Sequence, residues 1–478
     1  RVIPSLLAGI VVGAWFYAWP SATGLWYGLL DVIDTWVLRA LVPADGGTGH
    51  MSIMLFTMLI GGMVGIVYRN GGASAIVEAL TGWARTRKKG EVAAAGVGTA
   101  VFFDDYSSLL VTGNAVRPIT DRLRVSREKL SYIVDTTSAP IATFALVTTW
   151  IGFQVGLIGD ATAGLEGYEA TPYATFLGAL PYMFYPILAF LFMWMVVLTG
   201  RDFGPMARAQ ARALDGPLSG GAAEEQDKDE LTVKEGIPYR AINAWLPIAV
   251  LIVVTIAALF VTGSGETVTD IIGSADSFSA LLWGSLLSVL VAGALSVGQG
   301  VLSLGETVDA WLDGVKAMFG VLVILTLAWA LSDVTDALNA AGYLAHLLGE
   351  QLSPVWMPSL IFLLAAGISF ATGTSWGTMG ILLPLAVPLA WAVGETQGLA
   401  GADLQSLLYA TTAAVLGGAI WGDHTSPISD TTVLAAATSQ CGLIEHVNTQ
   451  LPYGILVGAV AVGGGLIPVG FGYPWWIG

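Results

Sequence analysis

The chain has 478 residues, of which 55% are hydrophobic and only 11% are charged, whereas soluble globular proteins carry about 25% charged residues. It has 19 Lys and Arg residues against 35 Asp and Glu residues, a net charge of −16, and one cysteine. This composition predicts an all-α polytopic membrane protein and excludes a water-soluble enzyme, a nucleic-acid binder and a disulfide scaffold.

Apolar runs predict membrane segments in two halves of the chain. In the first half they lie at residues 3–19, 50–68, 91–103, 106–116, 141–158 and 173–199, with an amphipathic stretch at 22–42. Residues 201–236 are polar and predict an exposed cytoplasmic linker. The second half has runs at 241–262, 277–297, 317–331, 357–371, 378–394, 404–420 and 451–470. Because the chain starts at Arg1 and enters an apolar run at once, we expect that an upstream piece precedes it.

The two halves repeat each other at an offset near 270 residues. Residues 91–103 match 361–373, and each run ends at a polar cluster, residues 104–108 and 374–378. Farther along, Asp135-Thr-Thr-Ser-Ala-Pro-Ile141 matches Asp423-His-Thr-Ser-Pro-Ile428. Two polar clusters in the same order in each half predict a duplication.

The positive charges predict how the two copies are oriented. Eighteen of the 19 Lys and Arg residues lie at or before Arg240, and several flank both ends of the segment 91–116. Both ends are therefore expected on the cytoplasmic side. The two runs reach roughly 20 Å and 17 Å, short of the 30 Å hydrocarbon core, which predicts a re-entrant hairpin. The matching segment of the second half lacks basic flanks and should enter from outside, so the repeats are predicted to have inverted topology.

A second polar cluster in each half predicts a broken transmembrane helix. Pro140 and Pro427 each prevent a normal helical hydrogen bond, and the adjacent Thr and Ser residues offer hydroxyl oxygens. Unpaired backbone at membrane depth is tolerated only where protein or water satisfies it. Such oxygens are the ligands that a hard cation such as Na⁺ prefers.

Five aspartates in these clusters are candidate ion-binding residues: Asp104, Asp105, Asp135, Asp423 and Asp430. A charge at the bilayer centre costs at least about 2.5–3.5 kcal/mol, so each of these aspartates is a candidate functional residue. The alternative interpretation is that some of them only cap the N-termini of helices at the hairpin tips. Neighbouring carboxylates in a low dielectric hold a cation or a proton. The neighbouring His424 is a candidate proton relay or a hydrogen-bonded structural group.

These residues lead to a prediction of two related sites. The first, between the hairpin tip and the first broken helix, comprises Asp105, Ser107, Asp135, Thr136, Thr137 and Ser138, with Na⁺ held chiefly by Asp105, Asp135 and Ser138. The second comprises Thr374, Ser375, Asp423, Thr425 and Ser426. Protonation of the carboxylates would expel Na⁺. No Walker motif, redox cysteine pair or metal-binding Cys/His spacing occurs, so we expect an ion gradient as the energy source, no cofactor and no enzymatic activity.

The polar segments and their flanks resemble one family closely. The chain resembles the NhaC-type Na⁺/H⁺ antiporters of the ion-transporter superfamily. The resemblance is most specific at residues 102–114, 117–140, 369–378 and 422–432, and it extends over residues 1–470. It implies a multi-pass protein of the cytoplasmic membrane that exchanges Na⁺ for H⁺. It also implies a scaffold that forms a homodimer and a transport domain that moves like an elevator.

The resemblance implies a division of the chain into seven segments. These are scaffold helices at 1–90, the first hairpin and broken helix of the transport domain at 91–158, a scaffold helix at 159–200, the linker at 201–236, scaffold helices at 237–356, the second hairpin and broken helix of the transport domain at 357–440, and a C-terminal helix at 441–478. The substrate stays open, because relatives exchange organic anions or amino acids. The alternative function is therefore a Na⁺- or H⁺-coupled transporter of such a solute. An intramembrane hydrolase and a channel are disfavoured, since no Gly-x-Gly-Asp pattern or continuous pore is predicted.

Overall fold

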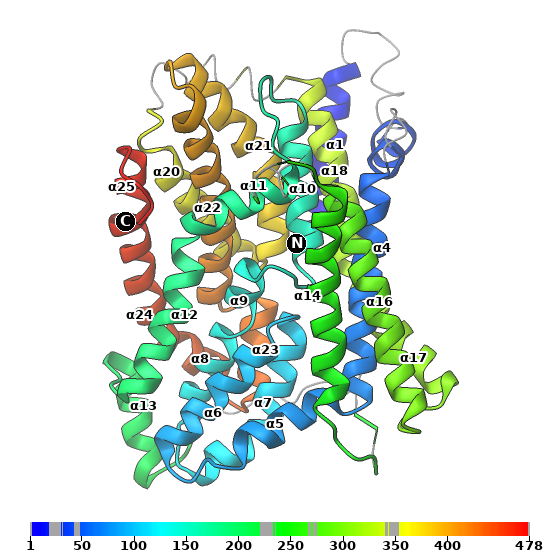
Figure 1. Cartoon of the computed structure of the whole chain (residues 1–478). Coiled ribbons are helices and arrows are strands. Elements are labelled where there is room, and N and C mark those ends of the chain that lie inside the picture. The colour runs from blue at the N-terminus through cyan, green and yellow to red at the C-terminus, as the bar shows by residue number, and fades with distance from the viewer. Residues whose placement is uncertain are drawn as a thin grey trace.

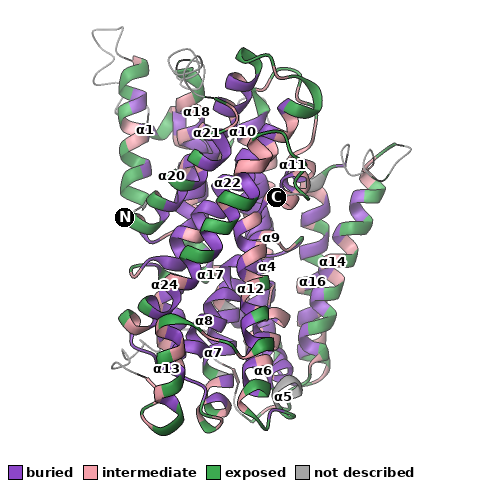
Figure 2. Cartoon of the chain, turned by 90° about the vertical axis from the view of Figure 1, so that its left-hand side faces the viewer, coloured by how far each residue is buried: buried purple, intermediate pink, exposed green. Residues whose placement is uncertain are grey.

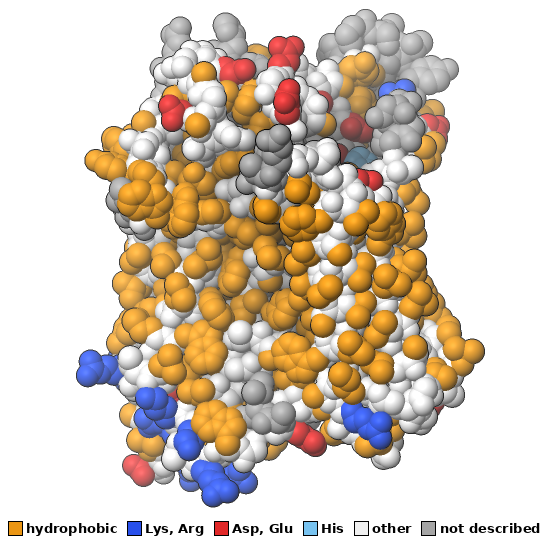
Figure 3. Space-filling view, viewed as in Figure 1, with side chains coloured by type: hydrophobic (Ala, Val, Ile, Leu, Met, Phe, Trp, Pro, Cys, Tyr) orange, Lys and Arg blue, Asp and Glu red, His pale blue; other side chains and the backbone are white. Residues whose placement is uncertain are grey.

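The computed structural model describes residues 2–18, 30, 32–42, 48–219, 233–234, 236–265, 268, 271, 275–339, 343 and 353–476. Among these residues all regular structure is helical. Eight helical segments in the described ranges are long and apolar enough to cross a membrane: Gly49–Arg69, Phe184–Asp215, Ile242–Thr262, Phe278–Gly298, Leu304–Ala337, Ser375–Thr396, Gly401–Thr425 and Leu443–Gly470. A broad hydrophobic band crosses the face of the molecule seen in Figure 3, and Lys and Arg gather at the lower end of this face. The predicted all-α multi-pass membrane protein is confirmed.

The helices of the first half largely follow the predicted runs. They are α1 (Val2–Ala18), η1 (Val32–Val37), α3 (Leu38–Leu41), α4 (Gly49–Arg69), α5 (Gly72–Thr81), α6 (Arg87–Ala100), α7 (Asp105–Arg122), α8 (Arg127–Thr136), α9 (Ala139–Phe144), α10 (Ile151–Ala163), α11 (Pro172–Ala179), η2 (Leu180–Tyr182), α12 (Phe184–Thr199) and α13 (Gly204–Asp215). Helix α13 occupies the start of the predicted linker. Residues 220–232 and 235 of that linker lie outside the described residues.

The second half contains α14 (Ile242–Thr262), α16 (Ser277–Gly298), α17 (Leu304–Ala317), α18 (Phe319–Ala337), α20 (Met357–Thr372), α21 (Ser375–Thr396), α22 (Gly401–Thr425), α23 (Asp430–Thr438), α24 (Leu443–Val460), η3 (Ala461–Leu466) and α25 (Ile467–Gly470). Buried residues fill the middle of the bundle, while outer helices such as α1 and α13 keep exposed faces (Figure 2).

Two helical hairpins approach the centre from opposite ends. Helices α6 and α7 pack against each other in the lower half of the molecule, and α20 and α21 do so in the upper half (Figure 1). Helix α7 is longer than the predicted run of 106–116, because the polar residues up to Arg122 continue it past Pro118. At the tip of the second hairpin Gly373 has a φ of +70°, and a Cβ there would lie 2.5 Å from the carbonyl oxygen of Ile428. Only glycine fits this position.

Each hairpin is followed by a helix that stops near the middle of the molecule. Helix α8 ends at Thr136, and α9 starts with Pro140 in its first turn. The predicted run of 141–158 is itself divided, because residues 145–150 are not helical. Thr148 explains this division. Its hydroxyl donates to the carbonyl of Ala142 at 3.0 Å and accepts from the amide of Trp150 at 3.1 Å, which replaces bonds that a continuous helix would make.

A close approach between the first hairpin and the first broken helix gives a stability prediction. A Cβ on Gly98 of α6 would lie 2.0 Å from Oγ1 of Thr137, whereas a Cβ on Gly96 would meet no atom within 4 Å. We expect Gly98→Ala to lower the free energy of unfolding by about 1–3 kcal/mol through overpacking. Thermal unfolding of the purified protein in detergent measures this. The matched control Gly96→Ala should be neutral or slightly stabilising, and equal melting temperatures for the two variants would contradict the packing described.

Candidate functional site

The ends of the two broken helices are held by side chains that replace missing backbone bonds. At the end of α8 the hydroxyl of Thr137 donates to the carbonyl of Ile133 at 2.9 Å, and Ser138 donates to the carbonyl of Asp135 at 2.6 Å. At the end of α22 the hydroxyl of Ser426 donates to the carbonyl of Phe370 in α20 at 2.8 Å. The second break is thereby attached to the second hairpin.

Asp135 lies in the last turn of α8 and is 1% exposed. Its Oδ2 accepts a hydrogen bond from Nε2 of Gln450 at 2.6 Å and from the hydroxyl of Thr432 at 3.4 Å. Nε2 of His446 lies 3.3 Å from the same oxygen, and Nε2 of His424 lies 4.0 Å from it. The other oxygen, Oδ1, is buried and has no hydrogen-bond partner among the described residues. One carboxylate oxygen is therefore anchored, and the other is available to a ligand.

Asp423, in the last turn of α22, is anchored through both oxygens. The hydroxyl of Ser429 donates to Oδ1 at 2.9 Å and that of Thr431 donates to Oδ2 at 2.8 Å. Asp423 is 1% exposed. Its carboxylate has lost its hydration shell but keeps two hydroxyl donors, which stabilise the charged form.

Asp430, in the first turn of α23, connects the second break to the first hairpin. The hydroxyl of Tyr106 in α7 donates to Oδ2 of Asp430, and the amide of Thr431 donates to Oδ1 at 2.9 Å. Asp430 is exposed, unlike Asp135 and Asp423. Polar groups from both halves of the chain thus meet in one region, rather than in two separate sites.

The first hairpin tip carries two further buried carboxylates. Asp105, in the first turn of α7, is 2% exposed, and its Oδ2 has no hydrogen-bond partner among the described residues. Asp104 is also 2% exposed, and its Oδ1 accepts from the hydroxyl of Thr149 at 3.0 Å. The positive end of α7 favours a negative charge at Asp105.

His424 connects both broken helices to a third element. Its Nδ1 lies 2.8 Å from the hydroxyl of Tyr185 in α12, and its Nε2 lies 3.1 Å from the hydroxyl of Thr136. The carbonyl oxygen of His424 accepts from Gln450, which also holds Asp135. A proton on this ring would lie within reach of the first break.

The remaining predicted residues hold the framework instead of facing these carboxylates. The hydroxyl of Thr425 donates to the carbonyl of Trp421 at 2.8 Å, and that of Thr374 accepts from the amide of Gly377 at 3.3 Å as the N-cap of α21. Ser375 is buried at 2% exposure. The side chain of Ser107 lies outside the described residues.

A comparison with known protein families identifies the family of the chain. The model of the Na⁺/H⁺ antiporter family matches residues 141–469, which include the second hairpin and both carboxylates of the second break. The chain belongs to the Na⁺/H⁺ antiporter family. The Na⁺/H⁺ antiporter family expected from the sequence motifs is confirmed.

Individual relatives place this Na⁺/H⁺ antiporter family member among transporters. It is 33% identical to an uncharacterized protein of Haemophilus influenzae over 99% of this chain and 88% of that protein. It is 41% identical to the malate-2H⁺/Na⁺-lactate antiporter of Bacillus subtilis over 19% of this chain and 18% of that protein. The structure of Neisseria gonorrhoeae MtrF, described as one of a class of antimetabolite efflux pumps, has a TM-score of 0.61 and 14% identity, and covers 98% of this chain and 94% of MtrF. The last likeness shows a shared fold.

The family member contains site residues that were not predicted from the sequence. His446 and Gln450 stand one turn apart on α24 and both contact Asp135. Both fall in the expected C-terminal helix of 441–478, but they precede its apolar run, which begins at 451, and no role was predicted for them. The signal in the sequence was that His446, Thr449 and Gln450 share one face of a helix that continues into an apolar run, where polar residues indicate function. Helix α24 therefore contributes to the site, although it was predicted to lie outside the transport domain.

Proposed function

We propose that this protein is a secondary active transporter that exchanges Na⁺ for H⁺ across the cytoplasmic membrane. The observation that carries the proposal is the state of Asp135, which is buried, fixed through Oδ2 and open at Oδ1. Burial of a carboxylate is costly, and His446 and His424 lie against Oδ2, so we expect Oδ1 to take either a proton or a metal ion. Competition for one oxygen couples the two fluxes directly.

The Na⁺ ion would be held by oxygens from the first hairpin and the first break. Oδ1 of Asp135 and Oδ2 of Asp105 are buried carboxylate oxygens without hydrogen-bond partners among the described residues. No three His, Cys, Asp or Glu side chains of the described residues converge as a metal site. The coordination shell would therefore include hydroxyl and carbonyl oxygens, with Ser107 and Ser138 as the proposed hydroxyl ligands. Asp423 and Asp430 would form the related second half of the same region.

We also propose that the two halves are inverted repeats and that transport is of the elevator type. The support is the matching order of elements: hairpin α6–α7 in the lower half is followed by the break α8–α9, and hairpin α20–α21 in the upper half is followed by the break α22–α23 (Figure 1). Under this proposal residues 91–158 and 357–440, with the site-bearing turns of α24, move against a scaffold that forms the homodimer. Asp135 and Asp423 occupy matching places at the ends of α8 and α22.

Transport in proteoliposomes tests the proposed exchange. We expect an outward proton gradient to drive ²²Na⁺ uptake, and a Na⁺ gradient to move protons in the opposite direction without any added organic solute. Replacing Na⁺ by choline should abolish the proton movement. Proton-independent Na⁺ flux, or no Na⁺ flux at any pH from about 6 to 9, would refute the exchange.

A second candidate function is Na⁺- or H⁺-coupled transport of a small organic anion or amino acid. The similarity to the malate-2H⁺/Na⁺-lactate antiporter favours it. Against it, the described side chains that bond to Asp135, Asp423 and Asp430 are His, Gln, Ser, Thr and Tyr, with no Lys or Arg to neutralise a carboxylate solute. Uptake of labelled malate, lactate and arginine by the same proteoliposomes separates the two candidates.

A further inference from the structure

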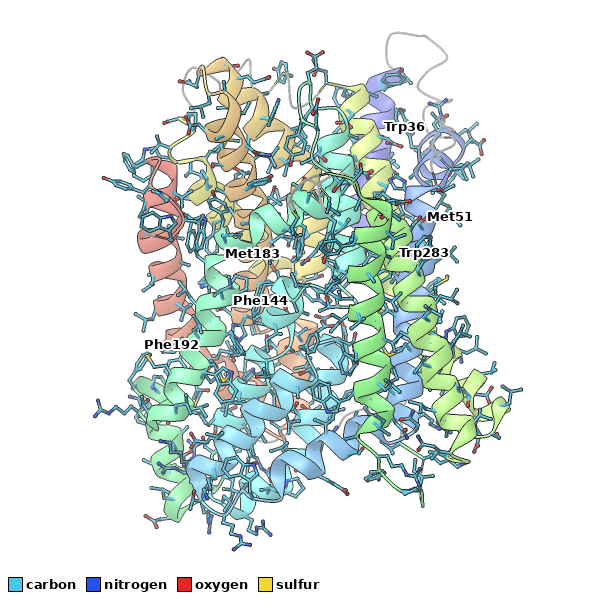
Figure 4. The ribbon with its side chains drawn as sticks, in the orientation of Figure 1. Trp36, Met51, Phe144, Met183, Phe192 and Trp283 are labelled. Atoms are coloured by element: carbon cyan, nitrogen blue, oxygen red, sulfur yellow. The ribbon has the colours of Figure 1, made fainter. Side chains whose placement is uncertain are left out.

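A cavity of about 630 Å³ opens at the end of the molecule opposite the Lys and Arg cluster. It lies between α4, α10 and α18, and Trp36, which lines it, marks its position near the upper right in Figure 4. At that end a histidine and several acidic side chains are visible together (Figure 3). Because Lys and Arg mark the cytoplasmic side, the cavity faces the opposite side of the membrane.

The charged groups that line this cavity favour cations. The lining includes three carboxylates, those of Asp160, Asp333 and Asp336. It also includes one guanidinium group, that of Arg39, and the ionisable ring of His50. Nε2 of His50 in α4 lies 2.7 Å from Oδ1 of Asp160 in α10. An excess of carboxylates in a recess of low dielectric raises the local concentration of cations.

The floor of the cavity is an apolar layer between α4 and α10. Ile53 and Gly156 line the cavity, and a Cβ on Gly156 would lie 2.7 Å from the Ile53 side chain. One turn deeper, a Cβ on Gly152 would lie 2.5 Å from the ring of Phe56. Ile53 and Phe56 are each 1% exposed. The two glycines let these side chains fill the space between the helices, so water is excluded below the cavity.

The first hairpin tip lies directly beyond this layer. Thr149, two residues before α10 begins, donates from its amide to the carbonyl of Phe103 at 3.0 Å and from its hydroxyl to Asp104 at 3.0 Å. Gly156 and Ile151, the first residue of α10, are five residues apart, which corresponds to roughly 7.5 Å along the helix, and Thr149 lies two residues before Ile151. Two layers of apolar side chains therefore separate the cavity from the carboxylates of the hairpin tip.

We infer that this cavity is the outer mouth of the cation path and that Ile53 and Phe56, packed on Gly156 and Gly152, form its gate. The inference rests on the proposed cation transport, because it assigns a route to the site described above. The contact between His50 and Asp160 joins α4 to α10 at the mouth and holds the gate closed. Opening requires α10 to separate from α4 by the thickness of these side chains.

Cysteine accessibility tests the gate directly, since Cys441 is the chain's one cysteine and is buried. In a Cys441→Ala background in right-side-out vesicles, Thr35→Cys in the cavity wall should react from outside with a membrane-impermeant, positively charged methanethiosulfonate. Thr149→Cys, below the gate, should react slowly. Adding Phe56→Ala should raise the reaction rate at Thr149→Cys about tenfold, because loss of the ring opens a path for water.

The matched control is Leu55→Ala, which removes a neighbouring side chain of α4 that is 48% exposed, unlike the buried Phe56. It should leave the reaction rate at Thr149→Cys unchanged. Phe56→Leu is a milder second variant if Phe56→Ala folds poorly, and it should give an intermediate rate. Equal rates in the Phe56 and Leu55 variants, or an unreactive Thr35→Cys, would overturn the inference. The labelling result does not depend on the solute carried, so it can fail while Na⁺/H⁺ exchange is confirmed, and the reverse.

Discussion

Replacement of Asp135 by asparagine is expected to abolish Na⁺-driven proton movement. The amide keeps the size of the side chain and has an oxygen for the hydrogen bond from Gln450, but it neither binds a proton nor carries the charge that attracts Na⁺. Loss of one charge-assisted interaction of about 3 kcal/mol corresponds to at least about a 100-fold fall in exchange. The measurement is the Na⁺-driven pH change in inverted vesicles or proteoliposomes.

The control for this variant is Asp313→Asn on α17. Asp313 forms an exposed ion pair with Lys316 at 2.9 Å and is 43% exposed, and such surface pairs contribute about 0–1 kcal/mol. The exchange rate of Asp313→Asn should equal that of the unmodified protein.

Asp105→Asn should lose exchange to the same extent as Asp135→Asn. Exchange retained in both Asp105→Asn and Asp135→Asn would refute a site shared by Na⁺ and H⁺.

Removal of the amide of Gln450 should move the pH dependence of Na⁺ binding. Gln450 donates to Asp135 at 2.6 Å, and a donor to a carboxylate favours its charged form over its protonated form. In Gln450→Leu the carboxylate should keep its proton to higher pH. A hydrogen bond to a charged group contributes about 1.5–3 kcal/mol, so half-maximal Na⁺ binding should shift roughly one to two pH units toward alkaline values. A pH series of ²²Na⁺ binding to purified protein measures the shift.

Thr449→Ser is the matched control for this prediction. Thr449 precedes Gln450 on α24, and its hydroxyl donates to the carbonyls of Glu445 and His446 within its own helix. Serine preserves those bonds, so the pH profile should stay in place. An unshifted profile in Gln450→Leu, or a shift toward acidic pH, would show that α24 does not tune Asp135.

The convergence of both halves on one region has a mechanistic consequence for the proposed exchange. Thr432 and Gln450 come from the second half of the chain and hold Asp135 of the first half, and Tyr106 of the first half holds Asp430 of the second. A change of charge at one carboxylate therefore acts on the others through these direct contacts, and no long chain of intervening residues is needed. Coupling of the two ions then needs only competition within this region.

The sequence by itself determined the class of molecule and the local architecture. Composition and apolar runs indicated a polytopic helical protein, and Pro140 and Pro427 marked both places where helices stop. The tip of the first hairpin was expected at residues 104–108, and the structure places the connection between α6 and α7 at residues 101–104. These features follow from local chemistry, because prolines, hydroxyl side chains and apolar periodicity act on residues within a few positions of themselves.

Only the tertiary structure decided which groups surround each carboxylate. Asp135 meets His446 and Gln450 across more than 300 residues, and Tyr106 meets Asp430 across 324. Such contacts depend on how hairpins and broken helices pack, and apolar patterns specify which face of a helix is buried but not its partner. For the same reason the sequence does not predict the proposed gate, in which Ile53 and Phe56 pack on two glycines of α10. In the sequence these residues are ordinary members of apolar runs.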